Sequence, residues 1–212
     1  MEEKLAFLDE HYLSHFDYLD VDSVIQEQKA FGACQDVTLE YPVAENEGEE
    51  DNTYLSYNMV VGNAADSQMA MAFEVLDYAL LSAPGAPLKQ ALLDVKAGKD
   101  VYGSYDDGIL QPYFTVIAKG SNPDRKEEFV SVIRQVLGDI VKNGIDKKAV
   151  EAGINYFEFR YREADFSSYP KGLMYSLDIL GDWLYEKGNP FAQVQQLTVF
   201  EKLKKAVNER IF

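Results

Sequence analysis

The spacing of apolar residues divides the chain into strand-like and helical segments. Alternation with a period of two predicts a strand at 36–43, and strand-like runs predict further strands at 53–62, 100–105 and 109–119. Spacings of three and four residues predict helices at 2–17, 66–81, 88–95, 122–142, 146–164 and 169–186, with further helical segments after 191. Hairpin-linked strands with several helices are typical of an α+β fold, with an antiparallel-rich sheet packed against helices. We therefore expect one domain over 1–212, with an opening helix and connector at 1–35 and an α+β core at 36–212.

Three details of this pattern make specific structural predictions. The segment 53–62 has apolar residues at both parities, which favours a strand covered on both faces. Pro112 falls inside the segment 109–119, which predicts an edge strand or a bulge there. Asp66 or Ser67 is expected to cap the helix 66–81. The core-facing residues expected on that helix are Met69, Phe73, Leu76 and Leu80.

The stretch 80–112 carries the densest set of backbone signals. Pro84, Gly85 and Pro87 form a corner between two predicted helices, and Pro87 suits the first turn of the second one. Asp107-Gly108 is a favoured pair for a hairpin turn. We interpret these residues as architectural, because turn residues alone do not make a site.

Charge and composition limit the classes of partner. The formal net charge is −16, which argues against nucleic-acid binding because that needs a basic surface, and which favours cationic partners such as basic peptides. Five acidic residues fall in the nine of segment 44–52, which predicts a solvated loop. That loop lacks the ligand spacing of an EF-hand, so we expect no metal there. No apolar run approaches the roughly 18 residues of a membrane span, so we expect no membrane partner.

The cysteine content and the N-terminus bear on the compartment. Cys34 is the only cysteine, so no disulfide can form within the chain, and it has no nearby histidine that would activate its thiol. We expect Cys34 to be inert. The acidic N-terminus lacks the basic start of a signal peptide. These features favour a cytoplasmic location.

His11 and His15 form the most suggestive chemical motif. Two histidines four residues apart can lie on one helix face, and inverted zinc peptidases use H-x-x-E-H, where the glutamate activates water. Ser14 stands at the glutamate position here, and a serine hydroxyl is no general base near neutral pH. We therefore predict no catalytic, cofactor-binding or metal-binding residues in this chain.

Several longer stretches show a family resemblance. The chain resembles the presequence-protease branch of the insulinase (pitrilysin) zinc metallopeptidases. The similar segments are FLDEHYLSHFD, TYLSYNMVVG, ALLSAPGAPLKQALLD, GKDVYGSYDDGILQPYFTVIAKG, VKNGIDKKAVEAGINYFEFRYREADF and SYPKGLMYSLDILGDWLY. They extend over nearly the whole chain and align with the second domain of the family's N-terminal half. That domain follows the one that carries H-x-x-E-H.

The resemblance implies a fold, a role and a set of partners. It implies the LuxS/MPP-like metallohydrolase fold, in a non-catalytic domain that supports the catalytic one and forms part of a closed chamber where unstructured oligopeptides are cut. The partners would be other domains of the same polypeptide and peptide substrates. Zinc would belong to the parent enzyme's catalytic domain, so this chain alone is expected to be inactive. Two alternatives stay open, namely an independent acidic module that binds cationic peptides, and a hydrolase that uses carboxylates.

Overall fold

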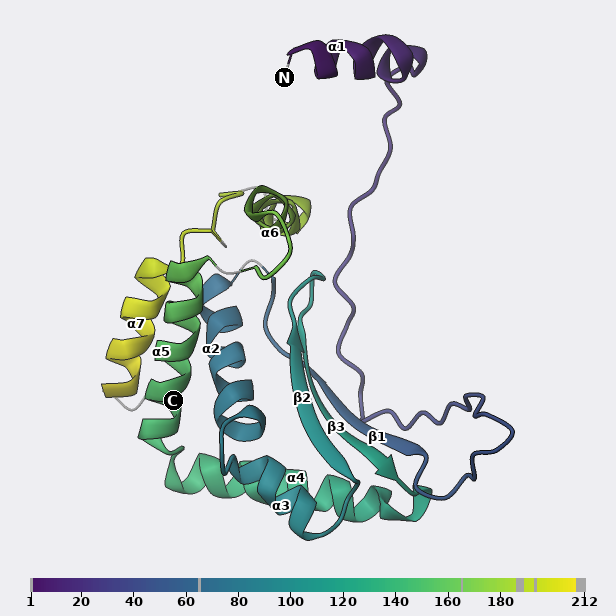
Figure 1. The fold of residues 1–212 in the computed structure, drawn as a ribbon, viewed down its shortest axis with the longest axis vertical. Helices are drawn as coiled ribbons and strands as arrows, with labels where there is room; N and C mark the ends of the chain where they lie inside the picture. Colours follow the sequence, from purple (N-terminus) through teal and green to yellow (C-terminus); the bar gives the residue numbers. More distant parts are fainter. Residues whose placement is uncertain (1, 65, 165, 186–188, 193, 209–212) are drawn as a thin grey trace.

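The α+β class is confirmed by the computed structural model, which describes residues 2–64, 66–164, 166–185, 189–192 and 194–208. Helices and strands alternate along the chain before a final all-helical part (Figure 1). The helices are α1 (Glu2–His11), α2 (Ser67–Asp77), α3 (Pro87–Asp94), α4 (Lys126–Asn143), α5 (Lys147–Glu163), α6 (Lys171–Tyr185) and α7 (Leu197–Asn208). The strands are β1 (Thr53–Val60), β2 (Asp100–Asp106) and β3 (Tyr113–Ser121).

The three strands form one antiparallel sheet in the order β1-β3-β2. Val116 of the central strand β3 pairs with Tyr57 of β1 on one side and with Gly103 of β2 on the other. The prediction that Pro112 lies in an edge strand is therefore wrong. A central strand needs its amide groups for two neighbours, so β3 begins just after the proline. The carbonyl of Pro112 instead accepts a hydrogen bond from the amide of Val61 at 2.8 Å.

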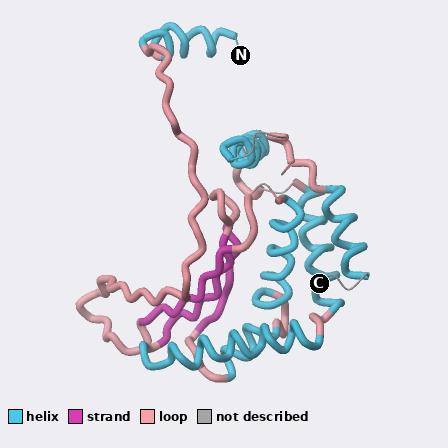
Figure 2. The backbone as a smooth tube through the Cα atoms, turned by 180° about the vertical axis from the view of Figure 1, so that it is seen from behind, coloured by secondary structure: helices cyan, strands magenta, loops and turns pink. Residues whose placement is uncertain are grey.

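The sheet is covered on one face only. Figure 2 shows the helices of the body gathered on one side of the strands. Leu55, Val101 and Val116 are buried on that side, whereas Tyr54, Val60 and Tyr102 on the other side are exposed. The prediction of a two-sided cover for 53–62 is therefore wrong. The apolar residues of 53–62 that point away from the helices, Tyr54 and Val60, are exposed on the other face of the sheet. On that face, Nζ of Lys119 lies 5.8 Å from the ring centroid of Tyr54.

Helix α2 lies between two apolar clusters. Phe73 and Leu76 pack against the sheet cluster as predicted, whereas Met69 is 41% exposed and not in the core. A second side of the helix is buried against α5 and α7 through Met71 and Val75. The carboxylate of Asp66 caps the helix, accepting from the Met69 amide at 2.9 Å, as one of the two predicted caps.

The long helices after the sheet each bury apolar residues in one of the two clusters. On α4, Phe129 and Ile133 are buried in the sheet cluster. On α5, Val150 and Ile154 are buried in the second cluster, and the Asp146 carboxylate caps the helix by accepting from the Lys148 amide at 2.9 Å. In the described part of the chain, no helix combines the length and apolar character that crossing a membrane requires.

The N-terminal part departs from prediction. Helix α1 ends at His11, short of the predicted residue 17, and a 3-10 turn follows at Leu13–His15. The segment 36–43 is extended and exposed and forms no strand. A strand requires a partner for its backbone groups, and this segment meets β1 through side chains, with the rings of Tyr41 and Tyr54 5.8 Å apart.

Candidate functional site

Three carboxylates, from α2, the β2–β3 turn and α6, act electrostatically on Glu74 of α2. We call Glu74 and Asp77 of α2, Asp107 of the β2–β3 turn and Asp178 of α6 the acidic cluster. Helix α2 is held over β2 by the ring of Phe73, which stacks on that of Tyr105 at 5.5 Å and 13°. This packing brings Glu74 within electrostatic range of Asp107 in the hairpin turn.

Glu74 has the most strongly shifted acidity of the cluster. Its pKa is raised from 4.5 to about 7, mainly by burial and also by the negative charges of Asp107, Asp77 and Asp178, while Arg160 on α5 lowers it. Loss of water and nearby like charges both disfavour a carboxylate ion. Near neutral pH, Glu74 therefore exists in both protonation states.

Asp77 lies against strand β2, where its Oδ1 would be 2.4 Å from a Cβ atom added at Gly103. The hydroxyl of Ser82 donates to its Oδ2 at 3.4 Å, whereas its buried Oδ1 has no hydrogen-bond partner among the described residues. Burial raises the pKa of this carboxyl, which the Ser82 hydrogen bond partly offsets. A buried oxygen without a donor costs free energy, so this end of α2 stores an unfavourable interaction.

The hairpin turn contributes the remaining shifted groups. Burial raises the pKa of Asp107, and its own backbone amide lowers it. Burial also raises the pKa of Tyr105 to about 12, helped by the charges of Asp107, Glu74 and Asp66. Burial is thus the largest cause of the raised pKa at Glu74, Asp77, Asp107 and Tyr105.

Glu74 of the cluster has the acidity of a general acid or base. A carboxyl whose pKa lies near neutrality can exchange protons at physiological pH. Throughout the described ranges, no group of three or more histidine, cysteine or acidic side chains is arranged to hold a metal ion. Sequence reasoning missed this cluster. Its only local signal is the pair of acids Glu74 and Asp77 on an otherwise apolar helix.

His11 and His15 do not fit a zinc site. The backbone leaves the helical conformation at Tyr12, with φ −134° and ψ −64°, so the two histidines are not one turn apart on a continuous helix. The His11 ring lies 4.3 Å from that of Phe7, and the Ser14 hydroxyl donates to the carbonyl of Glu10 at 3.3 Å. Both histidines are exposed, and the position of the catalytic base remains a serine.

Cys34 is an exposed free thiol in the connector before β1. Its sulfur donates to the carbonyl of Gln35 at 3.8 Å. The prediction that Cys34 is inert stays a prediction.

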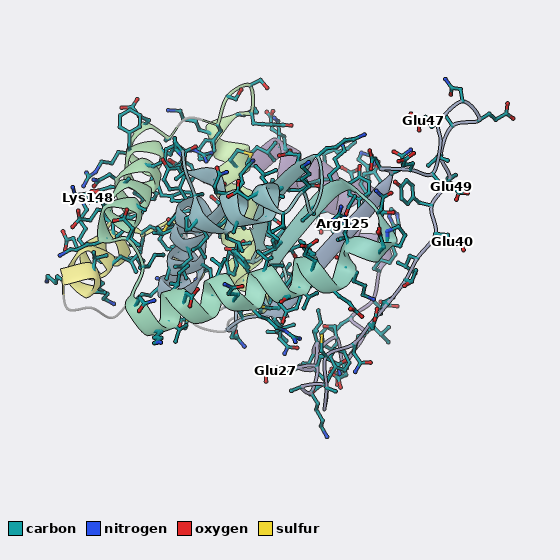
Figure 3. The ribbon with its side chains drawn as sticks, turned by 90° about the horizontal axis from the view of Figure 1, so that it is seen from below. Glu27, Glu40, Glu47, Glu49, Arg125 and Lys148 are labelled. Atoms are coloured by element: carbon teal, nitrogen blue, oxygen red, sulfur yellow. The ribbon has the colours of Figure 1, made fainter. Side chains whose placement is uncertain are left out.

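The acidic loop 44–52 projects from the body. Figure 3 shows Glu47 and Glu49 on this projection, far from Lys148 on α5. Its end is anchored, because the Asp51 amide donates to Asn122 Oδ1 and Asn122 Nδ2 donates to Asp51 Oδ1, both at 2.8 Å. The loop therefore offers a solvated acidic surface with a fixed base.

Comparison with known proteins identifies the family. The family described as the Peptidase M16 inactive domain matches residues 2–157. The chain belongs to this family of inactive M16 peptidase domains. Protein HypA of Clostridium perfringens is 41% identical over 100% of the chain, and presequence protease 1 of Arabidopsis thaliana is 29% identical over 88% of it. The resemblance to presequence proteases is confirmed.

Solved structures support the same fold. An inactive peptidase domain from Bordetella parapertussis aligns over 75% of this chain and 86% of its own, with a TM-score of 0.55 and 15% identity. An M16-like protein from Alicyclobacillus acidocaldarius aligns over 74% of this chain and 36% of its own, with a TM-score of 0.51 and 18% identity. At these identities the likeness concerns the fold alone.

The inactive domain covers only part of its relatives. It spans 22% of Protein HypA, 17% of the Arabidopsis enzyme and 20% of the mitochondrial presequence protease of Xenopus laevis. In each of these proteins, the similar region is therefore accompanied by several times its own length of other sequence.

Proposed function

We propose that this domain is a structural, non-catalytic part of a presequence-protease-like zinc metalloendopeptidase that degrades unstructured oligopeptides. It would support the catalytic domain and form part of the wall of the substrate chamber. Its partners would be other domains of the same polypeptide and peptide substrates, in the cytoplasm. Zinc would be bound by the parent enzyme's catalytic domain, with no catalytic, cofactor or metal residue in 1–212, which we treat as one domain.

The match to the inactive-domain family over 2–157 carries this proposal. Two of the relatives are named presequence proteases, and the chain spans about a fifth of their length. The inability of His11, Ser14 and His15 to form the zinc-peptidase motif supports an inactive role. The open face of the sheet supplies a surface that the domain's own helices leave uncovered.

The negative charge favours basic peptides as substrates of the parent enzyme. A domain with a net charge of −16 attracts cationic chains electrostatically. Reversing the charges of acids on the chamber side, in the complete enzyme, should selectively weaken kcat/KM for basic peptides. An equal loss for basic and acidic peptides would contradict this part of the proposal.

A direct test of the inactive role uses the chain by itself. We expect no stoichiometric zinc by elemental analysis and no cleavage of unstructured peptides by the purified chain. A longer polypeptide that includes an H-x-x-E-H domain should cleave the same peptides and lose activity with a chelator. One equivalent of tightly bound zinc in the short chain, with chelator-sensitive cleavage, would refute the proposal.

The second candidate is an independent acidic module that binds cationic peptides without catalysis. The charge of the acidic loop and of the whole chain favours it. A gene that encodes H-x-x-E-H upstream of residue 1 would favour the peptidase domain. A gene confined to these 212 residues would favour the binding module.

A further inference from the structure

Helix α6 presents a continuous apolar face to solvent. Its four leucines recur at spacings of four, three and four residues, which places them on one stripe of the helix. Their exposed fractions lie between 48% and 65%, and Trp183 beside them is 68% exposed. The leucines of this face are Leu173, Leu177, Leu180 and Leu184.

The opposite side of α6 faces the domain's own body. Met174, Tyr175 and Asp178 are half-buried there. The ring of Tyr175 contacts that of Phe166 edge-on at 5.2 Å, and Asp178 is near enough to Glu74 to act on its charge. The helix thus turns a partly polar side inward and its leucines outward, the reverse of a helix that packs on its own core.

Helix α7, by comparison, buries its apolar face within the domain. Its Val199, Phe200 and Leu203 are buried against α5 and α2. In α6, by contrast, none of the described side chains is buried. In Figure 1, α6 is seen apart from the layer formed by α2, α5 and α7. The leucine face is therefore left uncovered by the residues that the structure describes.

The length of the relatives suggests an occupant for the leucine face. The inactive-domain match ends at residue 157, before α6 begins, and the chain spans only 22% of Protein HypA. We propose that the leucine face of α6 is the docking surface for another domain of the same, longer polypeptide, which contacts it through an apolar helix or sheet face. This inference rests on the proposed function, because that function places the domain within a multidomain chain. The leucines themselves carry no charge, so the partner surface is apolar at its centre.

The test compares α6 in two proteins, the 212-residue chain and the longer polypeptide that contains it. Hydrogen exchange of the amides at 171–185 should slow at least tenfold in the longer protein, because docking protects the helix. The double substitution Leu177→Glu/Leu180→Glu should abolish this protection. Val141→Glu is the matched control, since Val141 is an apolar residue 87% exposed on α4, and it should leave the protection intact.

Measurements on the short chain separate docking from folding. Leu177→Glu/Leu180→Glu should leave its circular dichroism and melting temperature unchanged, since neither side chain is buried, and should reduce its binding of an apolar dye. Equal exchange of α6 in both proteins would overturn the proposal. So would a dimer of the short chain in which the same substitution abolishes both dimerisation and α6 protection, because a second copy would then be the occupant.

The hydrogen-exchange test of docking does not depend on peptidase activity. Loss of cleavage in a longer polypeptide that still protects α6 would count against the proposed function and leave the docking surface in place. Unprotected α6 in an active enzyme would count against the docking surface alone.

Discussion

The carboxylate of Asp77 lies against the backbone of Gly103, at the crossing of α2 and β2. A methyl group on Gly103 would stand 2.4 Å from Asp77 Oδ1 and 2.3 Å from Leu81 Cδ1. Gly103 pairs with Val116 of the central strand, so β2 cannot retreat without losing its place in the sheet. The absent side chain is what allows helix and strand to approach this closely.

Gly103→Ala should therefore destabilise the domain. The added methyl group forces Asp77 and the buried Leu81 to move, and overpacking of this kind typically costs about 1–3 kcal/mol. Urea unfolding followed by circular dichroism measures the loss. Gly138→Ala is the control, because Gly138 lies within α4 with nothing within 4 Å of the added carbon. It should stabilise by about 0.5–1 kcal/mol. Equal effects of the two substitutions would contradict the close packing.

Glu74 should make the stability of the domain depend on pH. Its pKa in the folded chain is raised from 4.5 to about 7, so the folded state binds a proton more tightly than the unfolded state. Its contribution is fully present below about 4.5 and is lost as the pH rises through about 7. Glu74→Gln should therefore be more stable than the wild type at pH 8.5, by on the order of 2 kcal/mol, and nearly equal to it at pH 5.

The comparison with a second glutamate isolates this effect. Glu151 is exposed on the neighbouring helix α5, so Glu151→Gln should leave the pH profile of unfolding unchanged. Thermal unfolding of the three proteins between pH 5 and 8.5 provides the data. A Glu74→Gln profile that parallels the wild type would show that burial does not perturb this carboxyl.

The elements that sequence predicts best are those whose apolar spacing is long and one-sided. The buried faces of α4 and α5 follow directly from that spacing, through residues such as Phe129 and Ile154. On α2, apolar residues lie on two sides. The sequence therefore predicted the buried stripe that includes Phe73 but not the second buried stripe, which includes Val75. A helix packed on both sides has no single periodic face to detect.

The missed features depend on contacts between distant segments. The segment 36–43 alternates like a strand, with Val37 and Leu39 exposed at 73% and 85%, yet alternation alone supplies no neighbouring strand. The acidic cluster joins Glu74, Asp107 and Asp178, which are far apart along the chain. Only the crossing of α2, the hairpin and α6 brings them together.

Glu158 should couple α5 to α7. Its Oε1 accepts from Nε and Nη2 of Arg162 at 3.0 and 2.7 Å, and its Oε2 accepts from Nζ of Lys204 on α7. These partners lower the pKa of Glu158, so the folded state favours its ionised form, and the stabilisation is lost as the pH falls through the lowered value. In a double-mutant cycle with Glu158→Gln and Lys204→Met, we expect a coupling of about 0.5–1 kcal/mol at pH 7.

The same cycle at two pH values checks the assignment. Protonation of Glu158 removes its charge, so the coupling should persist at pH 7 and be lost once the pH falls below the lowered pKa of Glu158. Strictly additive unfolding free energies at pH 7 would mean that the contact contributes nothing to the α5–α7 packing.

Asn122 should control the accessibility of the acidic loop. Its side chain exchanges two hydrogen bonds with Asp51, and Lys99 Nζ lies 3.3 Å from Asp51 Oδ2. The hydrogen bond from Asn122 is the main cause of the lowered pKa of Asp51. Asn122→Ala removes both bonds, so the pKa of Asp51 should rise toward its ordinary value and the loop should open more often. A glutamate-specific protease should then cleave 44–52 several-fold faster, because cleavage of a loop follows its open population. Asn143→Ala, at the end of α4, serves as the control and should not change the rate. Equal cleavage of the two variants would show that Asn122 does not hold the loop.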